Sequence, residues 1–248
     1  MRRIQHPDLC TSAMNRLAAV AVLLAPAAAA QVVPDRPGLG IGSEALTPGA
    51  VQVEAGLPEA ALTSGLDTYA LPVQLRVGLA PGIEARVAAG YSWALDALQN
   101  DAGSGFSPVV AGVKVEIPVP DVALALVTEV VVPVDGGGAV GVQLNAPATV
   151  TSGSVEVSLM PGVVVQDGTT TLNLVATLGR DLGGALSAYA ELGAFPVVGG
   201  GSGTPVYVGG GLTVIAHPDV QLDVFADAGV SGGAADVLIG VGLAFRIR

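Results

Sequence analysis

The sequence predicts an all-β protein, an antiparallel transmembrane β-barrel of about twelve strands. Apolar and polar residues alternate with a period of two along most of the chain, which is the pattern of strands with one apolar face. Apolar residues make up 51% of the 248 residues and charged residues only 12%. Beyond the N-terminal segment, no apolar run approaches the roughly 18 residues that a membrane-spanning helix requires. High hydrophobicity without such a run is typical of a barrel.

The predicted strands are separated by clusters of Gly, Pro, Asp and Ser. In the opening hairpin, segments 68–79 and 83–92 each carry one apolar face and one charged face. A soluble sandwich would bury the apolar face, but the chain has no helical pattern to cover so many strands, so the membrane barrel is favoured. The alternating segments, in order, are 51–57, 68–79, 83–92, 109–117, 122–132, 138–149, 155–166, 171–178, 186–192, 206–214, 220–227 and 237–247.

The connections between these segments indicate an even number of strands. Four connections are short: 80–82, 118–121, 180–184 and 216–219. For all four to lie at the same end of the barrel, the weakly patterned segment 138–149 must also hold a strand. An even count places both termini on that side, as in bacterial outer-membrane barrels with short periplasmic turns.

Aromatic residues and prolines refine this prediction. Membrane barrels place aromatic side chains at the interfaces, and Tyr91, Trp93 and Phe106 fall at strand ends on the predicted outer side. Pro72 and Pro161 lie inside predicted strands, where each removes a ladder hydrogen bond, so we expect bulges there.

The first 30 residues have the composition of an export signal. Arg16 precedes the apolar segment 17–24, and the four alanines 27–30 end the stretch. This order predicts a signal peptide cleaved after Ala30 and export to the bacterial outer membrane. The pattern begins at Met14, which is a second candidate for the start of the chain.

Three segments follow from these patterns. Residues 1–30 form the signal peptide, residues 31–48 a Pro- and Gly-rich extended arm on the periplasmic side, and residues 49–248 the barrel. The only cysteine, Cys10, would leave with the signal peptide, which excludes disulfides and thiol chemistry from the mature chain. We expect neither a cofactor nor a metal.

Charge limits the partners. Without the signal peptide the chain loses three arginines and one aspartate, which leaves 7 basic and 20 acidic residues. Such a chain repels nucleic acid, so we expect outer-membrane lipid and a small-molecule solute as partners instead.

The polar faces, turned inward, predict a narrow acidic lumen. Barrels of about eight strands are filled by side chains and those of about 16 leave a channel, so this barrel should be partly filled. Eight acidic and four basic side chains would face inward, an excess that favours cations. The lumen-lining candidates are Gln52, Glu54, Gln74, Arg76, Glu84, Arg86, Lys114, Glu116, Glu129, Glu156, Glu191, Asp223, Asp227 and Arg246.

Individual charged residues of this set can instead form structural ion pairs with their neighbours. Arg76 and Glu84 on adjacent predicted strands are one such pair. If the lumen conducts, replacing Glu54 and Glu84 with Gln should reduce its cation preference; indifference to these changes would indicate inverted faces or a pore lined by the N-terminal arm.

Three functions are compatible with such a barrel. A channel or transporter for small solutes is favoured, and a structural or surface-exposed barrel without a conducting pore is the first alternative. An outer-membrane hydrolase is the second; it would need a general base, usually His. The mature chain offers only His217, in the turn 217–219, with no recognisable partner, so we expect no enzymatic activity.

Several short motifs near the start of the predicted mature chain resemble those of a known protein family. The segment 34–38, Pro-Asp-Arg-Pro-Gly, is followed by Thr-Pro-Gly at 47–49, Gln-Val-Glu-Ala-Gly at 52–56 and Leu-Pro at 71–72. This series resembles the start of the outer-membrane transporter family named for the meta pathway of phenol degradation, and weaker similarity continues to residue 248. The resemblance implies a porin-like barrel, linked to uptake of aromatic or other small organic compounds, without established catalytic residues.

Overall fold

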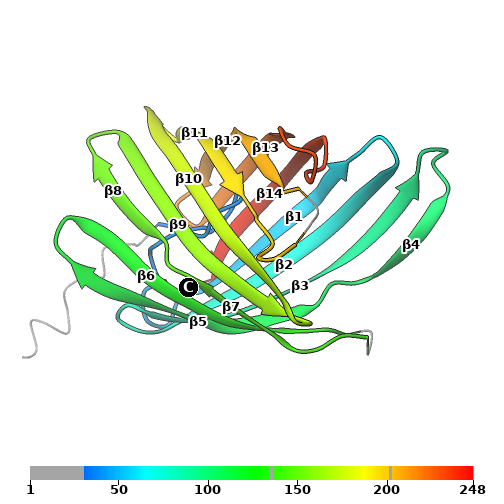
Figure 1. The fold of residues 1–248 in the computed structure, drawn as a ribbon. Helices are drawn as coiled ribbons and strands as arrows, with labels where there is room; N and C mark the ends of the chain where they lie inside the picture. The colour runs from blue at the N-terminus through cyan, green and yellow to red at the C-terminus, as the bar shows by residue number, and fades with distance from the viewer. Residues whose placement is uncertain (1–30, 135–136, 201–202, 248) are drawn as a thin grey trace, which may run out of the picture. The chain divides into compact units, whose positions relative to one another are not determined.

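The computed structural model describes residues 31–134, 137–200 and 203–247; the predicted signal peptide, 1–30, lies outside them. Regular structure in these residues is a single antiparallel sheet of 14 strands (Figure 1). None of the described segments forms a helix long and apolar enough to cross a membrane. The strands are β1 (Val51–Leu62), β2 (Leu66–Ala80), β3 (Ile83–Asp96), β4 (Asp101–Phe106), β5 (Val109–Val119), β6 (Val122–Val132), β7 (Gly141–Asn145), β8 (Ala148–Ser152), β9 (Val155–Gln166), β10 (Thr169–Gly183), β11 (Leu186–Ala194), β12 (Val206–His217), β13 (Val220–Gly229) and β14 (Val237–Ile247).

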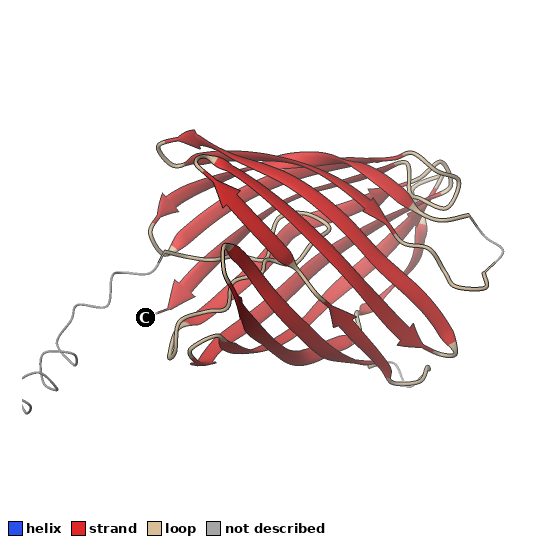
Figure 2. Cartoon of the chain, turned by 60° about the vertical axis from the view of Figure 1, so that its left-hand side comes forward, coloured by secondary structure: helices blue, strands red, loops and turns tan. Residues whose placement is uncertain are grey.

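The sheet closes on itself. β14 pairs with β1 and β9 pairs with β10, so the series of neighbours returns to its start, and the tilted strands enclose a lumen (Figure 2). Two positions in the wall are each occupied by two successive strands. β4 and β5 both pair with β3, and β7 and β8 both pair with β6 and β9. The wall therefore has 12 strands, which confirms the predicted antiparallel barrel.

Proline accounts for both interruptions. Pro108 separates β4 from β5 and Pro147 separates β7 from β8, and a proline has no N–H to donate to a neighbouring strand. Around Pro147 the ladder is kept by its carbonyl, which accepts the Ala125 N–H at 3.0 Å.

A register shift lies opposite one of the two prolines at which bulges are expected. Opposite Pro72 the pairing of β1 with β2 shifts between Ala55 and Glu59, but the extra residue is in β1, whose pairing with β14 shifts at the same place. At Pro161 the pairing of β9 with β10 continues without a shift, so that expectation is wrong. The ladder at Pro161 is instead interrupted on its other side, where the residues between β7 and β8 lie opposite.

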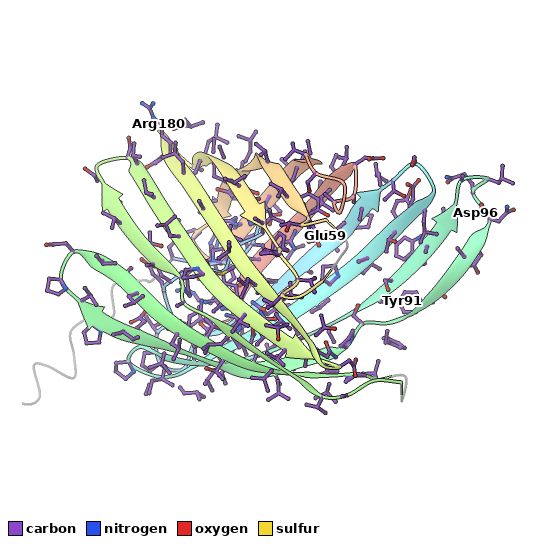
Figure 3. The ribbon with its side chains drawn as sticks, in the orientation of Figure 1. Glu59, Tyr91, Asp96 and Arg180 are labelled. Atoms are coloured by element: carbon purple, nitrogen blue, oxygen red, sulfur yellow. The ribbon has the colours of Figure 1, made fainter. Side chains whose placement is uncertain are left out.

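The two ends of the barrel differ in their connections. β1 begins and β14 ends at the end that carries most of the two-residue turns, as the short connections predict. Longer connections at the opposite end include 133–140, 195–205 and 230–236. Arg180 and Asp96 mark these two ends of the wall (Figure 3). Five two-residue turns, 81–82, 120–121, 153–154, 184–185 and 218–219, lie at the end where β1 begins, and a sixth, 167–168, lies at the opposite end.

The wall is apolar outside and polar inside. In β2 the side chains of Leu71, Val73 and Leu75 are 37% to 47% exposed, while Arg76 is fully buried. Large apolar side chains recur in this way on the outer face of every side of the barrel. Each would gain about 1.5–3 kcal/mol on leaving water, so an outer surface of this kind is stable against lipid chains.

Aromatic side chains gather where the outer face nears the long connections. Tyr69 stacks on Trp93 with ring centroids 5.5 Å apart, and Tyr91 meets Phe106 edge-on at 5.4 Å. Both pairs lie on the apolar face of β2, β3 and β4. This is the arrangement of an interfacial aromatic belt.

Candidate functional site

Residues 32–48, hereafter the internal arm, lie inside the barrel (Figure 1). The Val32 N–H donates to the Pro218 carbonyl (2.8 Å) in the turn between β12 and β13. The Leu39 N–H donates to Glu191 on β11 (2.8 Å), and the Leu46 N–H donates to Glu84 on β3 (3.0 Å). The arm thus enters at the turn end, crosses the lumen and returns to β1.

This position differs from the extended periplasmic arm that the sequence predicts for residues 31–48. The physical reason is polar satisfaction, because an extended Pro- and Gly-rich segment has no strand partner for its amide groups. The inward-facing carboxylates accept those hydrogen bonds. Glu54, for example, accepts the N–H groups of both Asp35 and Arg36.

Asp35 lies at the centre of the arm's contacts. Its carboxylate is 2.7 Å from Arg86 Nη1 on β3, 2.7 Å from Lys114 Nζ on β5 and 3.5 Å from Arg76 Nη1 on β2. Burial alone would raise the pKa of Asp35, but the positive charges of Arg76, Lys114 and Arg86 outweigh it and hold this pKa below its usual range. One carboxylate of the arm therefore joins three neighbouring strands.

The strand register explains why this acid is needed. Arg76 and Arg86 are direct partners in the pairing of β2 with β3, so two positive charges lie side by side. Arg76 forms ion pairs with Glu84 (2.7 Å) and Glu54 (2.8 Å), and Arg86 forms one with Glu129 (2.8 Å). The Arg76–Glu84 pair suggested by the sequence is present, as a buried contact.

Arg36 anchors the arm on the neighbouring strands of the wall. Its guanidinium forms ion pairs with Glu59 of β1 and with Asp223 of β13, the latter at 3.0 Å. Between these two strands it lies over Gly242 of β14, where a Cβ would collide with the guanidinium. Asp35 and Arg36 therefore bind two neighbouring sectors of the wall, β2 to β5 and β13 to β1.

The arm leaves two cavities in the lumen. The larger, about 440 Å³, lies between the arm and strands β8 to β12, and its lining includes Glu156, Arg180 and Met160. The smaller, about 250 Å³, lies between the arm and strands β1 to β3 and β13, and its lining includes Gln74 and Phe225. A barrel of this size is thus partly filled, by an arm as well as by side chains.

A family model described as "Putative MetA-pathway of phenol degradation" matches residues 34–247. The chain belongs to this family. The match begins one residue before Asp35 and ends one residue before the end of the chain, so it includes both the arm and the wall. The resemblance noted in the sequence is confirmed.

Solved structures with the same fold are outer-membrane channels and porins. The COG4313 outer membrane channel from Pseudomonas putida F1 has a TM-score of 0.68 and 12% identity, over 86% of this chain and 99% of that one. The NanC porin has a TM-score of 0.54 and 9% identity, over 79% and 100% of the two chains. The KdgM porin, in complex with disordered oligogalacturonate, has a TM-score of 0.53 and 10% identity, over 80% and 99%. No curated protein is similar enough in sequence to count as a relative.

In this family member the lumen-lining candidates lie on the polar face of their strands. Gln74 is half-buried, and Glu116 and Glu156 are exposed. That they border a solute path stays a prediction. The buried candidates are Gln52, Glu54, Arg76, Glu84, Arg86, Lys114, Glu129, Glu191, Asp223, Asp227 and Arg246.

Sequence reasoning missed the residues that join the arm to the wall. Asp35 and Arg36 were visible only as part of the family's opening motif, and Glu59 lies at a register shift where alternation fails. Asp219, which pairs with Arg246 at 2.7 Å, lies in a turn. Two adjacent, oppositely charged residues in an otherwise uncharged stretch, 31–43, were the available signal.

His217 has the surroundings of a turn residue. Its side chain is 64% exposed, and its Nδ1 accepts the Asp219 N–H at 3.2 Å. Within the described residues there is also no group of three or more His, Cys, Asp or Glu side chains placed to hold a metal ion.

Proposed function

We propose that this chain is an outer-membrane channel for small solutes, with a lumen narrowed by the internal arm. The supporting observation is the polarity of the closed wall, apolar outside and charged inside, around a cavity of about 440 Å³. Passage would follow the side of the lumen that the arm leaves open, between the arm and strands β8 to β12.

The lining of this cavity supports a small organic solute, aromatic compounds included. Met160 and Val175 offer apolar contacts, while Glu156 and Thr177 offer polar ones. A volume of this size falls within the roughly 300–1,000 Å³ of small-molecule sites. The phenol-degradation family to which the chain belongs points to the same solute class.

The lumen is proposed to prefer cations. Most inward carboxylates are neutralised by Arg36, Arg76, Arg86 and Lys114, but Glu156 borders the larger cavity and forms no ion pair among the described residues. A narrow passage with an excess of negative charge attracts cations and repels anions.

A barrel without a conducting pore is the second candidate, and the internal arm favours it. The arm contacts strands on opposite sides of the wall, through Asp35 at β2, β3 and β5 and through the Leu39 N–H at β11, and Arg36 adds contacts at β1 and β13. An arm held this firmly would block solutes. The protein would then serve a structural or surface role.

Conductance separates the two candidates. The full chain, purified in detergent and migrating in a heat-modifiable way on a gel, is inserted into planar bilayers, and its uptake of small phenols into liposomes is measured in parallel. A channel should give small, reproducible current steps and phenol-dependent swelling. A correctly folded protein that gives neither would overturn the channel proposal and leave the structural barrel.

A further inference from the structure

Two acidic side chains face each other inside the lumen. In the strand register Glu191 of β11 pairs with Gly209 of β12, and Gly209 pairs with Asp227 of β13. The two acids thus lie in one row, on either side of a residue without a side chain. A Cβ at Gly209 would collide with Asp227 Oδ1, so glycine at this position makes the close approach possible.

Asp227 is buried without a hydrogen-bond donor. Its side chain is 1% exposed, and no donor among the described residues reaches either carboxylate oxygen. Glu191 is 4% exposed; its Oε2 accepts the Leu39 N–H, while its Oε1 has no donor. The two carboxyl groups lie in one row across Gly209, and the buried hydroxyl of Tyr189, two residues before Glu191 on β11, also has no hydrogen-bond partner among the described residues.

This pair is an exception among the buried acids of the lumen. In the part of the chain that the structure describes, Glu54, Glu84 and Asp223 each form an ion pair with an arginine, but Glu191 and Asp227 form none. Two neighbouring buried carboxylates repel each other and lose hydration, and both effects cost stability. A positive charge between them would remove both costs.

We propose that Glu191 and Asp227 bind a hard cation of the Ca²⁺ class. Carboxylate oxygens are the ligands that Ca²⁺ prefers, and its flexible coordination geometry accepts carboxylates from different strands together with water. The Tyr189 hydroxyl and water complete the shell. The larger cavity reaches both Tyr189 and Glu191, so the ion enters from the lumen.

The bound cation would also order the internal arm. Glu191 holds the arm through the Leu39 N–H, and Gly38 packs against the same carboxylate. A cation that fixes this carboxylate therefore fixes the arm's most distant segment, on the far side from Asp35 and its three cations. The inference does not depend on whether the barrel conducts.

Calcium titration tests the site. The full chain in an uncharged detergent is stripped with a chelator and titrated with CaCl2 near neutral pH in a calorimeter. One saturable site per chain is expected. Removal of a partner outside the coordination shell already costs about tenfold or more in metal affinity, so Glu191→Gln and Asp227→Asn should each weaken binding at least that much. Glu156→Gln, which removes an equal charge from the same cavity, should leave binding unchanged.

Three results would overturn the proposal, provided that the variants keep heat-modifiable migration. The first is the absence of saturable Ca²⁺ binding. The second is equal weakening by Glu156→Gln, which would indicate diffuse attraction by an acidic lumen. The third is a thermal stability that depends on pH and on Asp227 but not on Ca²⁺, which would show that the two carboxyls share a proton instead. Bilayer conductance plays no part in these outcomes, so a failed site and a failed channel are distinguishable.

Discussion

Asp35 illustrates how one residue can organise a lumen. Three cations on β2, β3 and β5 lie close enough to repel one another, and the carboxylate of Asp35 lies within 3.5 Å of all three. Breaking a buried ion pair by removing one partner costs about 3–5 kcal/mol, because the remaining charge stays buried. The stability lost on removal of the Asp35 carboxylate is smaller if the arm leaves the lumen.

Replacing Asp35 with Asn should therefore release the arm rather than unfold the wall. We expect larger current steps in planar bilayers and faster proteolysis near residue 35, with heat-modifiable migration retained. Asp121→Asn is the control, because Asp121 is exposed in a two-residue turn and its change should alter neither measurement. Unchanged conductance and proteolysis in the Asp35 variant would show that the other arm contacts suffice.

A change at Gly242 tests the second anchor, Arg36, without removing a charge. A valine at this position would occupy the space of the Arg36 guanidinium and separate it from Asp223. Gly242→Val should raise conductance as Asp35→Asn does, whereas Gly105→Ala, at a position with open space around it, should not. A Gly242 variant with normal current steps would mean that Arg36 is not needed to hold the arm.

These anchors could be predicted from the sequence only in part. Arg76 and Glu84 lie on adjacent predicted strands, so their contact followed from alternation and a short turn. Asp35 and Arg36 precede the first strand, and Arg36 meets Asp223, which is 187 positions away. No local pattern encodes a contact of that kind, because it depends on the closure of the barrel.

At the scale of elements, the internal arm is held by the wall but contributes no strand to it. The ladder of hydrogen bonds from β1 to β14 is complete without residues 32–48. The arm instead supplies charges and amide groups to side chains that face inward. Its removal should therefore change what passes through the barrel more than whether the barrel forms.

Deletion of residues 32–46 should increase conductance several-fold and cost some stability. Lys114 would lose Asp35, its only ion-pair partner among the described residues, and would stay buried. Adding Lys114→Met to the deletion should restore the lost stability, measured as the urea midpoint in detergent, and keep the larger current steps. A deletion variant with unchanged steps would place the constriction in the wall.

The strands were more predictable than their connections to the arm. Alternation located most wall strands, because inward and outward positions differ in polarity. The weakly patterned segment that holds β7 was inferred from the parity of the connections, and β4 lies outside every predicted segment. The breaks at Pro108 and Pro147 were not foreseen, since each leaves the alternation on both sides intact. A bulge was predicted at Pro72, and the register of β1 shifts opposite that residue. The bulge predicted at Pro161 is absent, and the break between β7 and β8 lies opposite that residue instead.

At the scale of the whole molecule, the balance of charge across the lumen is uneven. The cations of β2, β3 and β5 form one cluster with Asp35, Glu54, Glu84 and Glu129. The wall on the other side borders the larger cavity and includes Glu156. This side chain is exposed and forms no ion pair among the described residues. Solutes in that cavity therefore meet mainly negative charge.

This imbalance changes which variants should affect ion selectivity. Glu54 and Glu84 are buried against Arg76, so Gln at either position should mainly reduce stability. Glu156→Gln should reduce cation preference in reversal-potential measurements, and the preference should weaken at high salt as screening shortens its range. Leu178→Val on the lipid face is the control. Anion selectivity of the unaltered protein would contradict the proposed acidic passage.

The stacked pair of Tyr69 and Trp93 offers a way to watch this barrel assemble. Trp93 is the chain's single tryptophan, and it faces outward near the end of the barrel opposite to the one where β1 begins and β14 ends. That end must cross the bilayer during insertion. The fluorescence of the unlabelled protein would therefore report one event, the arrival of this rim at the far leaflet, and brominated lipids confined to that leaflet would time it.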